Sequence, residues 1–67
     1  MKTVGERLKE LRINGGFTQQ DVANELQIDR SNYSKYELGK LEISIDMLIT
    51  LAKFYGVNAD YIIGLEG

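Results

Sequence analysis

The chain has 67 residues, which allows one domain, and it contains neither cysteine nor histidine. These absences exclude disulfides, thiolate zinc sites, cysteine nucleophiles and histidine acid–base catalysis. The formal net charge is −2, whereas most nucleic-acid-binding domains are basic overall, although the field at one face decides binding.

The N-terminal segment predicts a helix that begins after Thr3. Thr3 and Glu6 have the spacing of a capping box, in which each side chain accepts a hydrogen bond from the other residue's backbone N–H. Asn14-Gly15-Gly16 should end this helix, because glycine readily takes the left-handed conformation after a C-cap. Three apolar residues at i, i+4 and i+7 share one face: Val4, Leu8 and Leu11.

The next segment predicts a second helix over about residues 19–26. Thr18 is a favourable N-cap residue, and Asp21 stands at the N3 position. Val22, Ala23 and Leu26 should point inward. Ala23 is small where a larger aliphatic residue could stand, which suits a close crossing by a neighbouring helix.

A third helix is predicted over about residues 30–38, after a tight turn at Gln27-Ile28. Asp29 is its expected N-cap, and Gly39 should end it. Tyr33 and Tyr36 lie three residues apart and share the face expected to pack on the core, beside Ile28 and Glu37. The opposite face is small and polar, where a surface helix would more often carry Glu and Lys.

Two further helices complete the predicted fold. Ser44 should cap a fourth helix, which Gly56 ends, and Asn58 should cap a short helix from Ala59 to about Ile63. Because the loops are short, consecutive helices should lie side by side. The prediction is one compact all-α domain of five helices over residues 1–67. The fourth helix is expected to be the most buried, through a broad apolar stripe, Ile45, Leu48, Ile49, Ala52 and Tyr55, which is widened by Met47, Leu51 and Phe54.

The sequence resembles the phage-repressor and Cro-like (lambda-repressor-like) class of bacterial helix-turn-helix regulators. TQQDVANEL resembles the family's second helix, DRSNYSKYELGK its recognition helix, and LITLAKFYGVNADYIIG its fourth and fifth helices. The resemblance covers about residues 3–65. The family's turn glycine falls on Gln27, where a left-handed backbone costs roughly 1 kcal/mol or more. Glu42-Ile43 stand where the family often has proline, so that loop should be more mobile.

The outer face of the third helix has chemistry suited to base edges in the major groove. Arg30 and Ser31 lie in the first turn, from which a recognition helix reaches the bases. Arg or Lys can bridge O6 and N7 of guanine, Asn can pair with adenine, and Ser can donate or accept. An ordinary solvated helix face is the alternative. The predicted base-contacting residues are Arg30, Ser31, Asn32, Ser34 and Lys35.

Three other residues are predicted to contact phosphates. Thr18 and Gln19 lie at a helix N-terminus, where free N–H groups and the helix dipole attract anions. Lys40 follows the end of the third helix and would bind a phosphate by its charge. The resemblance also implies a structural ion pair between Arg12 and Glu37.

The positive charge available for DNA is small, which favours pairing of two chains. Between residues 30 and 40 the cations are Arg30, Lys35 and Lys40. A dimer would therefore neutralise roughly six phosphates, and a plot of log affinity against log salt concentration should have a slope near −5. A two-fold dimer would need a roughly palindromic operator with half-sites about 34 Å apart or a multiple of this. Ile62 should close the core. The candidate interface residues are Tyr61, Ile63 and Leu65.

The leading hypothesis is a sequence-specific regulator that binds double-stranded DNA as a homodimer and represses transcription in a phage or mobile element. The alternative is a protein–protein interaction module, antitoxin-like or anti-regulator, that uses the same face of the third helix. An enzyme is disfavoured, and no cofactor, metal or small-molecule substrate is expected. No apolar run approaches the roughly 20 residues of a membrane helix, and the charged N-terminus is unlike a signal peptide. The expected location is the cytoplasm, in association with the nucleoid.

Overall fold

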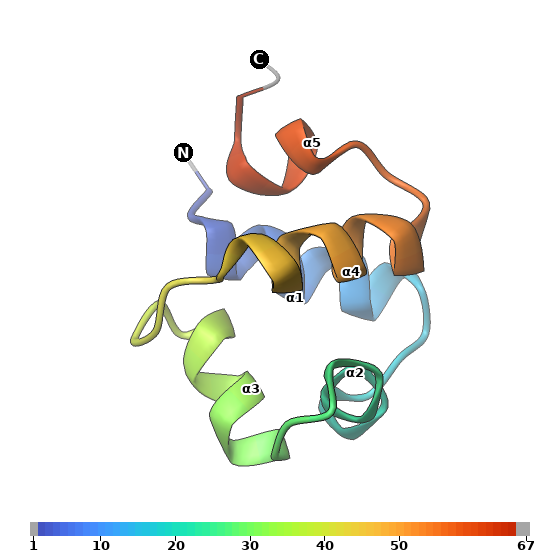
Figure 1. The fold of residues 1–67 in the computed structure, drawn as a ribbon, viewed down its shortest axis with the longest axis vertical. Helices are drawn as coiled ribbons and strands as arrows, with labels where there is room; N and C mark the ends of the chain where they lie inside the picture. Colours follow the sequence, from blue (N-terminus) through green and yellow to red (C-terminus); the bar gives the residue numbers. More distant parts are fainter. Residues whose placement is uncertain (1, 66–67) are drawn as a thin grey trace.

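The computed structural model of the chain describes residues 2–65, and this part contains five α-helices (Figure 1). The predicted all-α fold class and the predicted helix order are confirmed. The third helix ends one residue earlier than expected, and Glu66 and Gly67 of the predicted tail lie outside the described residues. The helices are α1 (Val4–Asn14), α2 (Gln19–Leu26), α3 (Arg30–Glu37), α4 (Ile45–Tyr55) and α5 (Ala59–Ile63).

The helices are arranged in three levels along the long axis of the molecule (Figure 1). α1 and α4 cross the middle, α2 and α3 lie below them, and α5 lies above them, on the side where the described chain begins and ends. α1 packs against α3 and α5, while α2 packs against α3 and α4, and α4 also contacts α5. The helix-turn-helix pair α2–α3 is therefore held from above by both central helices.

Local hydrogen bonds fix the helix starts. The hydroxyl oxygen of Thr3 accepts from the backbone N–H of Glu6 at 3.1 Å, and the Glu6 carboxylate accepts from the backbone N–H of Thr3 at 2.8 Å. Thr18 and Asp21 form a second reciprocal box at α2, with distances of 3.0 and 2.8 Å. Asp29 occupies the N-cap position of α3, but its side chain makes no capping hydrogen bond.

The turn between α2 and α3 depends on a left-handed residue that is not glycine. Gln27 has φ 59° and ψ 41°, and its backbone N–H bonds to the carbonyl groups of Ala23 and Asn24. This is the position where the resemblance places a glycine. The turn therefore forms with the expected geometry at a cost of about 1 kcal/mol.

The core lies where α2 and α3 meet the central helices and α5. Tyr33 is fully buried at its centre, and Ala23 is buried where α2 and α3 cross, as its small size predicted. Phe17, Phe54 and Tyr55 stack beside the core with ring centroids 4.8 to 6.2 Å apart. The fully buried apolar residues are Leu8, Val22, Ala23, Tyr33, Leu51 and Ile62.

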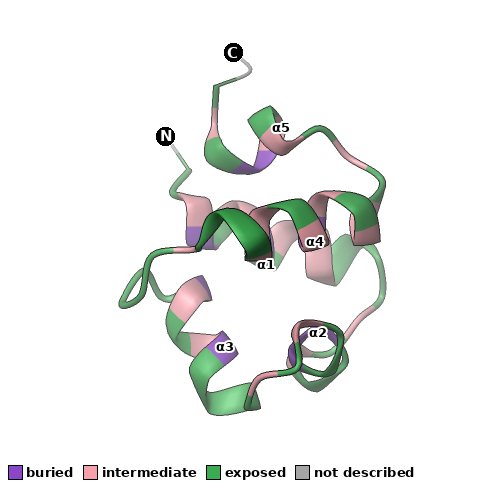
Figure 2. Ribbon diagram, in the orientation of Figure 1, coloured by how far each residue is buried: buried purple, intermediate pink, exposed green. Residues whose placement is uncertain are grey.

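The prediction that α4 is the most buried helix is wrong. Leu51 is its one buried residue, whereas Ile45 is 72% exposed and Ile49 47% exposed. α4 carries apolar residues on most of its circumference, so its sequence did not define which side packs. Figure 2 shows exposed stretches along α4, and Ile45 and Ile49 are among its exposed residues.

α1 and α3 approach most closely at Gly5, which is buried. A Cβ atom at this position would lie 2.2 Å from the carbonyl oxygen of Glu37 and 2.7 Å from that of Tyr36. Glycine inside a helix costs about 1 kcal/mol relative to alanine. Here it permits a helix–helix contact that any side chain would prevent.

Candidate nucleic-acid interface

α3 presents its polar side to solvent, as predicted. Arg30, Ser31, Asn32 and Lys35 are exposed, whereas Ser34 is half-buried. On the opposite side, Tyr33 is buried and Tyr36 is half-buried, so the helix is anchored by its aromatic face. The structure therefore brings four of the five predicted base-contacting residues onto open surface and places Ser34 at the edge.

Ser34 and Gln19 lie together at a polar depression between α1, α2 and α3, with a volume of about 480 Å³. Lys9 of α1 also lines it, which brings a further cation to the side of α3 that faces α1. No sequence signal identified Lys9, because it is one of several charged residues on the exposed sides of α1. Only the packing of α1 on α3 places it near the predicted site.

An ion pair between Arg12 and Glu37 locks α1 to the end of α3, as the resemblance implied. The Arg12 Nε donates to Glu37 Oε2 at 2.8 Å, and Nη2 donates to Oε1 at 3.2 Å. The third guanidinium nitrogen, Nη1, donates to the carbonyl of Phe17 at 3.1 Å, which adds the start of α2 to the network. The side chains are 12% and 3% exposed, so the pair is shielded from water.

The pKa of Glu37 reflects two opposed effects. Burial alone would raise it, but hydrogen bonds from Arg12 and Gln19 and the charge of Arg12 outweigh burial, so the pKa lies below its ordinary value. The pKa of Arg12 is raised by the same hydrogen bond to Glu37. Both residues are therefore charged at neutral pH. Glu37 is the one anion between residues 30 and 40, and its charge is compensated internally.

The side chain of Gln19 also belongs to this network. Its Nε2 donates to Glu37 Oε1 at 3.2 Å, and the residue is half-buried. The contact fixes the Gln19 amide at the N-terminus of α2. The sequence does not predict this hydrogen bond, because the two residues are 18 positions apart.

The N-terminus of α2 keeps donors for an anion even though its cap is complete. The box with Asp21 uses the backbone N–H of Thr18 and the oxygen of its hydroxyl, but the hydroxyl proton can still be donated. The backbone N–H groups of Gln19 and Gln20 have no partner within the helix, as in any first turn. Thr18 and Gln20 are exposed, whereas Gln19 is half-buried.

Lys40 is held close to the end of α3 by the backbone. Gly39 has φ 79°, and the backbone N–H of Lys40 donates to the carbonyl of Lys35 at 2.9 Å. Both lysines are exposed. The end of α3 thus offers two cations whose backbone positions are fixed relative to each other.

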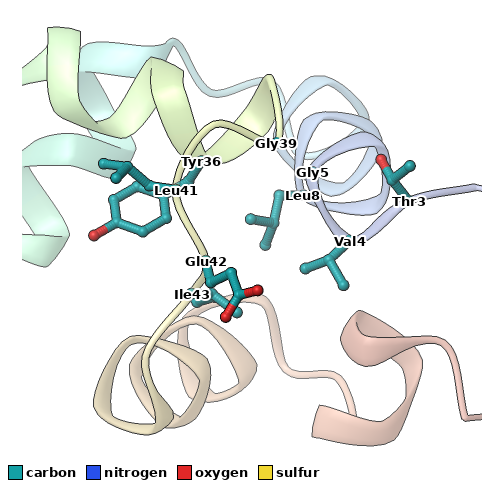
Figure 3. A pocket seen from close by; sticks show the side chains of 9 residues that line it. All are labelled: Thr3, Val4, Gly5, Leu8, Tyr36, Gly39, Leu41, Glu42 and Ile43. Atoms are coloured by element: carbon teal, nitrogen blue, oxygen red, sulfur yellow. The ribbon is translucent and has the colours of Figure 1, made fainter.

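A separate groove of about 430 Å³ lies between the N-terminus of α1 and the loop that follows α3 (Figure 3). Its walls are mainly aliphatic, from Val4, Leu8, Leu41 and Ile43, with the ring of Tyr36 at one side. Glu42 is the one carboxylate at its edge.

The C-terminal residues predicted to form an interface differ in exposure. Ile63 is 37% exposed and Leu65 72% exposed, whereas Ile62 is fully buried, as expected. Tyr61 is half-buried, with the guanidinium carbon of Arg7 5.5 Å from its ring centroid. Arg7 also donates to the Tyr61 carbonyl at 3.4 Å, so Tyr61 contributes to packing within the chain.

Within residues 2–65, no helix is long and apolar enough to cross a membrane. In the same range, no three His, Cys, Asp or Glu side chains form a group that could hold a metal ion.

Comparison with known proteins identifies the family. The family model described as helix-turn-helix domain matches residues 5–67. The chain is 42% identical over 59 residues to the SPbeta prophage-derived uncharacterized HTH-type transcriptional regulator YonR of Bacillus subtilis, covering 88% of this chain and 55% of YonR. It is 39% identical over 64 residues to the HTH-type transcriptional regulator ImmR of the same organism, covering 96% of this chain and 50% of ImmR.

A third relative is the cryptic phage CTXphi transcriptional repressor RstR of Vibrio cholerae. It is 33% identical over 51 residues, which cover 76% of this chain and 46% of RstR. The chain spans about half the length of the curated relatives it matches. These matches agree with the resemblance to phage-repressor and Cro-like regulators, and the chain belongs to the helix-turn-helix domain family.

Proposed function

We propose that this chain binds double-stranded DNA as the operator-reading domain of a transcriptional regulator, with α3 in the major groove. The observation that carries the proposal is the state of α3. Its polar face is exposed, its aromatic face is anchored in the core, and its one anion is buried against Arg12. A helix held in this way can enter a groove without changing its contacts to the rest of the domain.

In this function the first turn of α3 makes the base contacts. Arg30 would bridge O6 and N7 of a guanine, Ser31 would bond to a base edge beside it, and Lys35 would extend the contact by one turn. Asn32 would reach an adenine from one edge of the helix. Ser34, which is half-buried beside α1, would contact only a base that approaches this side.

Phosphate contacts would position the domain on the duplex. Thr18 and Gln19 would bind one phosphate through their side chains, assisted by the backbone N–H groups at the start of α2. Lys40 would bind a second phosphate beyond the end of α3. Glu37 would keep the Gln19 amide in place through the hydrogen bond that joins them.

The proposed active form is a homodimer on a roughly palindromic operator. One module of this kind buries about 600–1,000 Å² on DNA and seldom holds a site alone. Exposed Ile63 and Leu65 are available for pairing, with Tyr61 at the margin. We propose repressor action in the cytoplasm, by occupation of an operator in nucleoid or phage DNA, because the relative RstR is a phage transcriptional repressor.

A protein-interaction module is the second candidate. The net charge of −2 and the exposure of Leu38, which is 66% exposed at the end of α3, favour it. In that case the outer face of α3 would meet a protein partner in place of DNA. Such a face should not show the salt dependence that phosphate contacts cause.

Titration of the chain against random duplex DNA at increasing salt separates the two candidates. Phosphate binding predicts a slope of log affinity against log salt near −0.9 per neutralised phosphate. Absence of duplex binding even at low salt would eliminate the DNA proposal.

Substitutions then assign the contacts within the site. Arg30→Ala should remove about 1–3 kcal/mol of preference for the selected operator over other sequences. Lys40→Ala should instead weaken all duplexes alike and reduce the slope by about 1. Lys2→Ala, which removes an exposed cation near the start of α1 that is paired with Glu10, is the matched control and should change neither quantity.

A further inference from the structure

We infer that the uncovered face of α4 pairs antiparallel with the same face of a second copy of this chain. The inference rests on the dimer of the proposed function and specifies its contact surface. The face consists of the four exposed residues of α4, namely Ile45, Asp46, Ile49 and Lys53.

The apolar half of this face is exposed in the described part of the chain. Ile45 and Ile49 are one helical turn apart and are 72% and 47% exposed. Figure 2 shows exposed stretches along α4. Single exposed apolar residues are common on proteins, but adjacent isoleucines on one helix face form a continuous patch. Burial of this patch against an identical patch would remove both from water.

The charged residues of this face are complementary to those of a second copy only when the two α4 helices run antiparallel. Asp46 lies almost one turn before Ile49, and Lys53 lies about one turn after it. When two copies pack antiparallel around Ile49, Asp46 of each copy comes beside Lys53 of the other. Parallel packing would place like charges opposite each other, which is unfavourable. The face therefore selects the antiparallel arrangement.

The position of α4 in the fold makes this arrangement compatible with an operator. In Figure 1, α4 runs horizontally, with α2 and α3 below it and α5 above it. A vertical two-fold axis beside the uncovered face reverses the direction of α4 but keeps the α3 helices of both copies at the lower end. Both recognition helices then face the same side, as a palindromic duplex requires.

A contact made end to end through α5 alone has the opposite consequence. α5 lies at the end of the molecule away from α3 (Figure 1), so such a contact would direct the two α3 helices away from each other. Ile63 and Leu65 can widen the contact made by α4, on its side away from α3. An end-to-end contact through α5 cannot bring both α3 helices to one duplex.

The face is small, so free chains should associate weakly and pair fully only on DNA. Interfaces below about 1,200 Å² are typical of weak and transient contacts. An operator that holds two copies on adjacent half-sites raises their effective concentration and compensates for the small area.

Cysteine cross-linking tests the contact directly, because the chain has no cysteine of its own. Ile49→Cys places a thiol at the two-fold axis, and Ile13→Cys is a matched control at an isoleucine of α1 that is 55% exposed. Ile63→Cys reports on the C-terminal alternative. Each variant is oxidised at concentrations up to about 1 mM, where weak complexes begin to form, and the disulfide-linked dimer is quantified.

We expect Ile49→Cys to give several-fold more linked dimer than Ile13→Cys and more than Ile63→Cys. A larger yield from Ile63→Cys would overturn the inference in favour of pairing through α5. Equal yields from Ile49→Cys and Ile13→Cys would overturn it as well, because the α4 faces would then meet only by random collision.

A charge exchange tests the antiparallel direction. D46K and K53D should each lower the association constant measured by sedimentation, and the double variant D46K/K53D should restore it. Circular dichroism controls for folding. If the double variant associates no better than the single variants, the antiparallel arrangement is refuted.

Duplex binding separates failure of this inference from failure of the proposed function. Arg30 and Lys40 are unchanged in every α4 variant, so each variant should still bind random duplex at low salt as a monomer. Loss of pairing by the α4 variants with duplex binding retained supports the inference. If the unmodified chain binds no duplex, the proposed function fails, whereas the cross-linking result still decides the α4 contact.

Discussion

Removal of the Glu37 carboxylate should destabilise the domain more than any surface change. Glu37→Ala deletes the acceptor of two hydrogen bonds from Arg12 and one from Gln19. Arg12, whose side chain is 12% exposed, would keep its charge with only the Phe17 carbonyl as a partner. Breaking a buried ion pair on one side costs about 3–5 kcal/mol.

This cost is large compared with the stability of so small a domain. At about 0.05–0.15 kcal/mol per residue, 67 residues give a free energy of unfolding of roughly 3–10 kcal/mol. Glu37→Ala should therefore remove between a third and all of it, and lower Tm by at least about 12 °C. Thermal and urea unfolding followed by far-UV circular dichroism measure both quantities.

A double variant identifies the physical origin of this loss. Arg12→Met with Glu37→Met removes both charges while it keeps similar volumes, and such replacements are often neutral or stabilising. A cost below about 1 kcal/mol for Glu37→Ala would refute the reasoning, because the pair would then behave like an exposed one. A double variant as unstable as Glu37→Ala would refute it differently, since lost packing would explain the effect.

Four further predictions concern the backbone and pH, and each is checked by unfolding experiments. Gln27→Gly should raise the free energy of unfolding by about 1 kcal/mol, because glycine adopts φ 59° without strain. Gly5→Ala should lower it by about 2 kcal/mol or more, since its Cβ would meet the Glu37 carbonyl at 2.2 Å and helix propensity returns only about 1 kcal/mol. The pKa of Glu37 is lower in the folded state than its ordinary value of 4.5. The stabilisation that Glu37 provides should therefore be present above pH 4.5 and should be lost as the pH falls from 4.5 through the folded pKa. Burial raises the pKa of Tyr55 to about 12, so the contribution of Tyr55 to the free energy of unfolding should be lost as pH rises from 10 towards 12.

The helices and their ends were predictable because they depend on short spacings. Thr3 and Glu6, or Thr18 and Asp21, are three residues apart, and their reciprocal hydrogen bonds form within one helical turn. The left-handed turn at Gln27 was also expected, from the resemblance and not from propensity. Local geometry of this kind needs no knowledge of the rest of the fold.

The features that sequence reasoning missed depend on packing between distant segments. Gly5 is fixed by the approach of α3, and Lys9 reaches the site only because α1 lies beside Ser34. The buried face of α4 was predicted wrongly because apolar residues surround most of this helix. The positions of α2 and α5 decide which of these residues are covered. Periodicity cannot resolve a face when several faces are apolar.

The sequence predicted which residues form the candidate site more fully than it predicted the contacts of their side chains. Arg30, Ser31, Asn32 and Lys35 are exposed as expected, since Tyr33 on the opposite side has to be buried. Gln19 was predicted to contact a phosphate, and its side chain also bonds to Glu37, 18 residues later. When a side chain has two possible partners, its contact can be assigned only once the positions of both partners are known.

The contact between Arg7 and Tyr61 sets the order in which a newly made chain can fold. These residues are 54 positions apart, and Ile62 beside Tyr61 joins the same buried cluster as Leu8. A nascent chain can form the α2–α3 hairpin early, but α1 lacks half of its partners until α5 has left the ribosome. The domain should therefore complete its folding after synthesis of α5, and a chain cut before Asn58 should fail to fold as a unit.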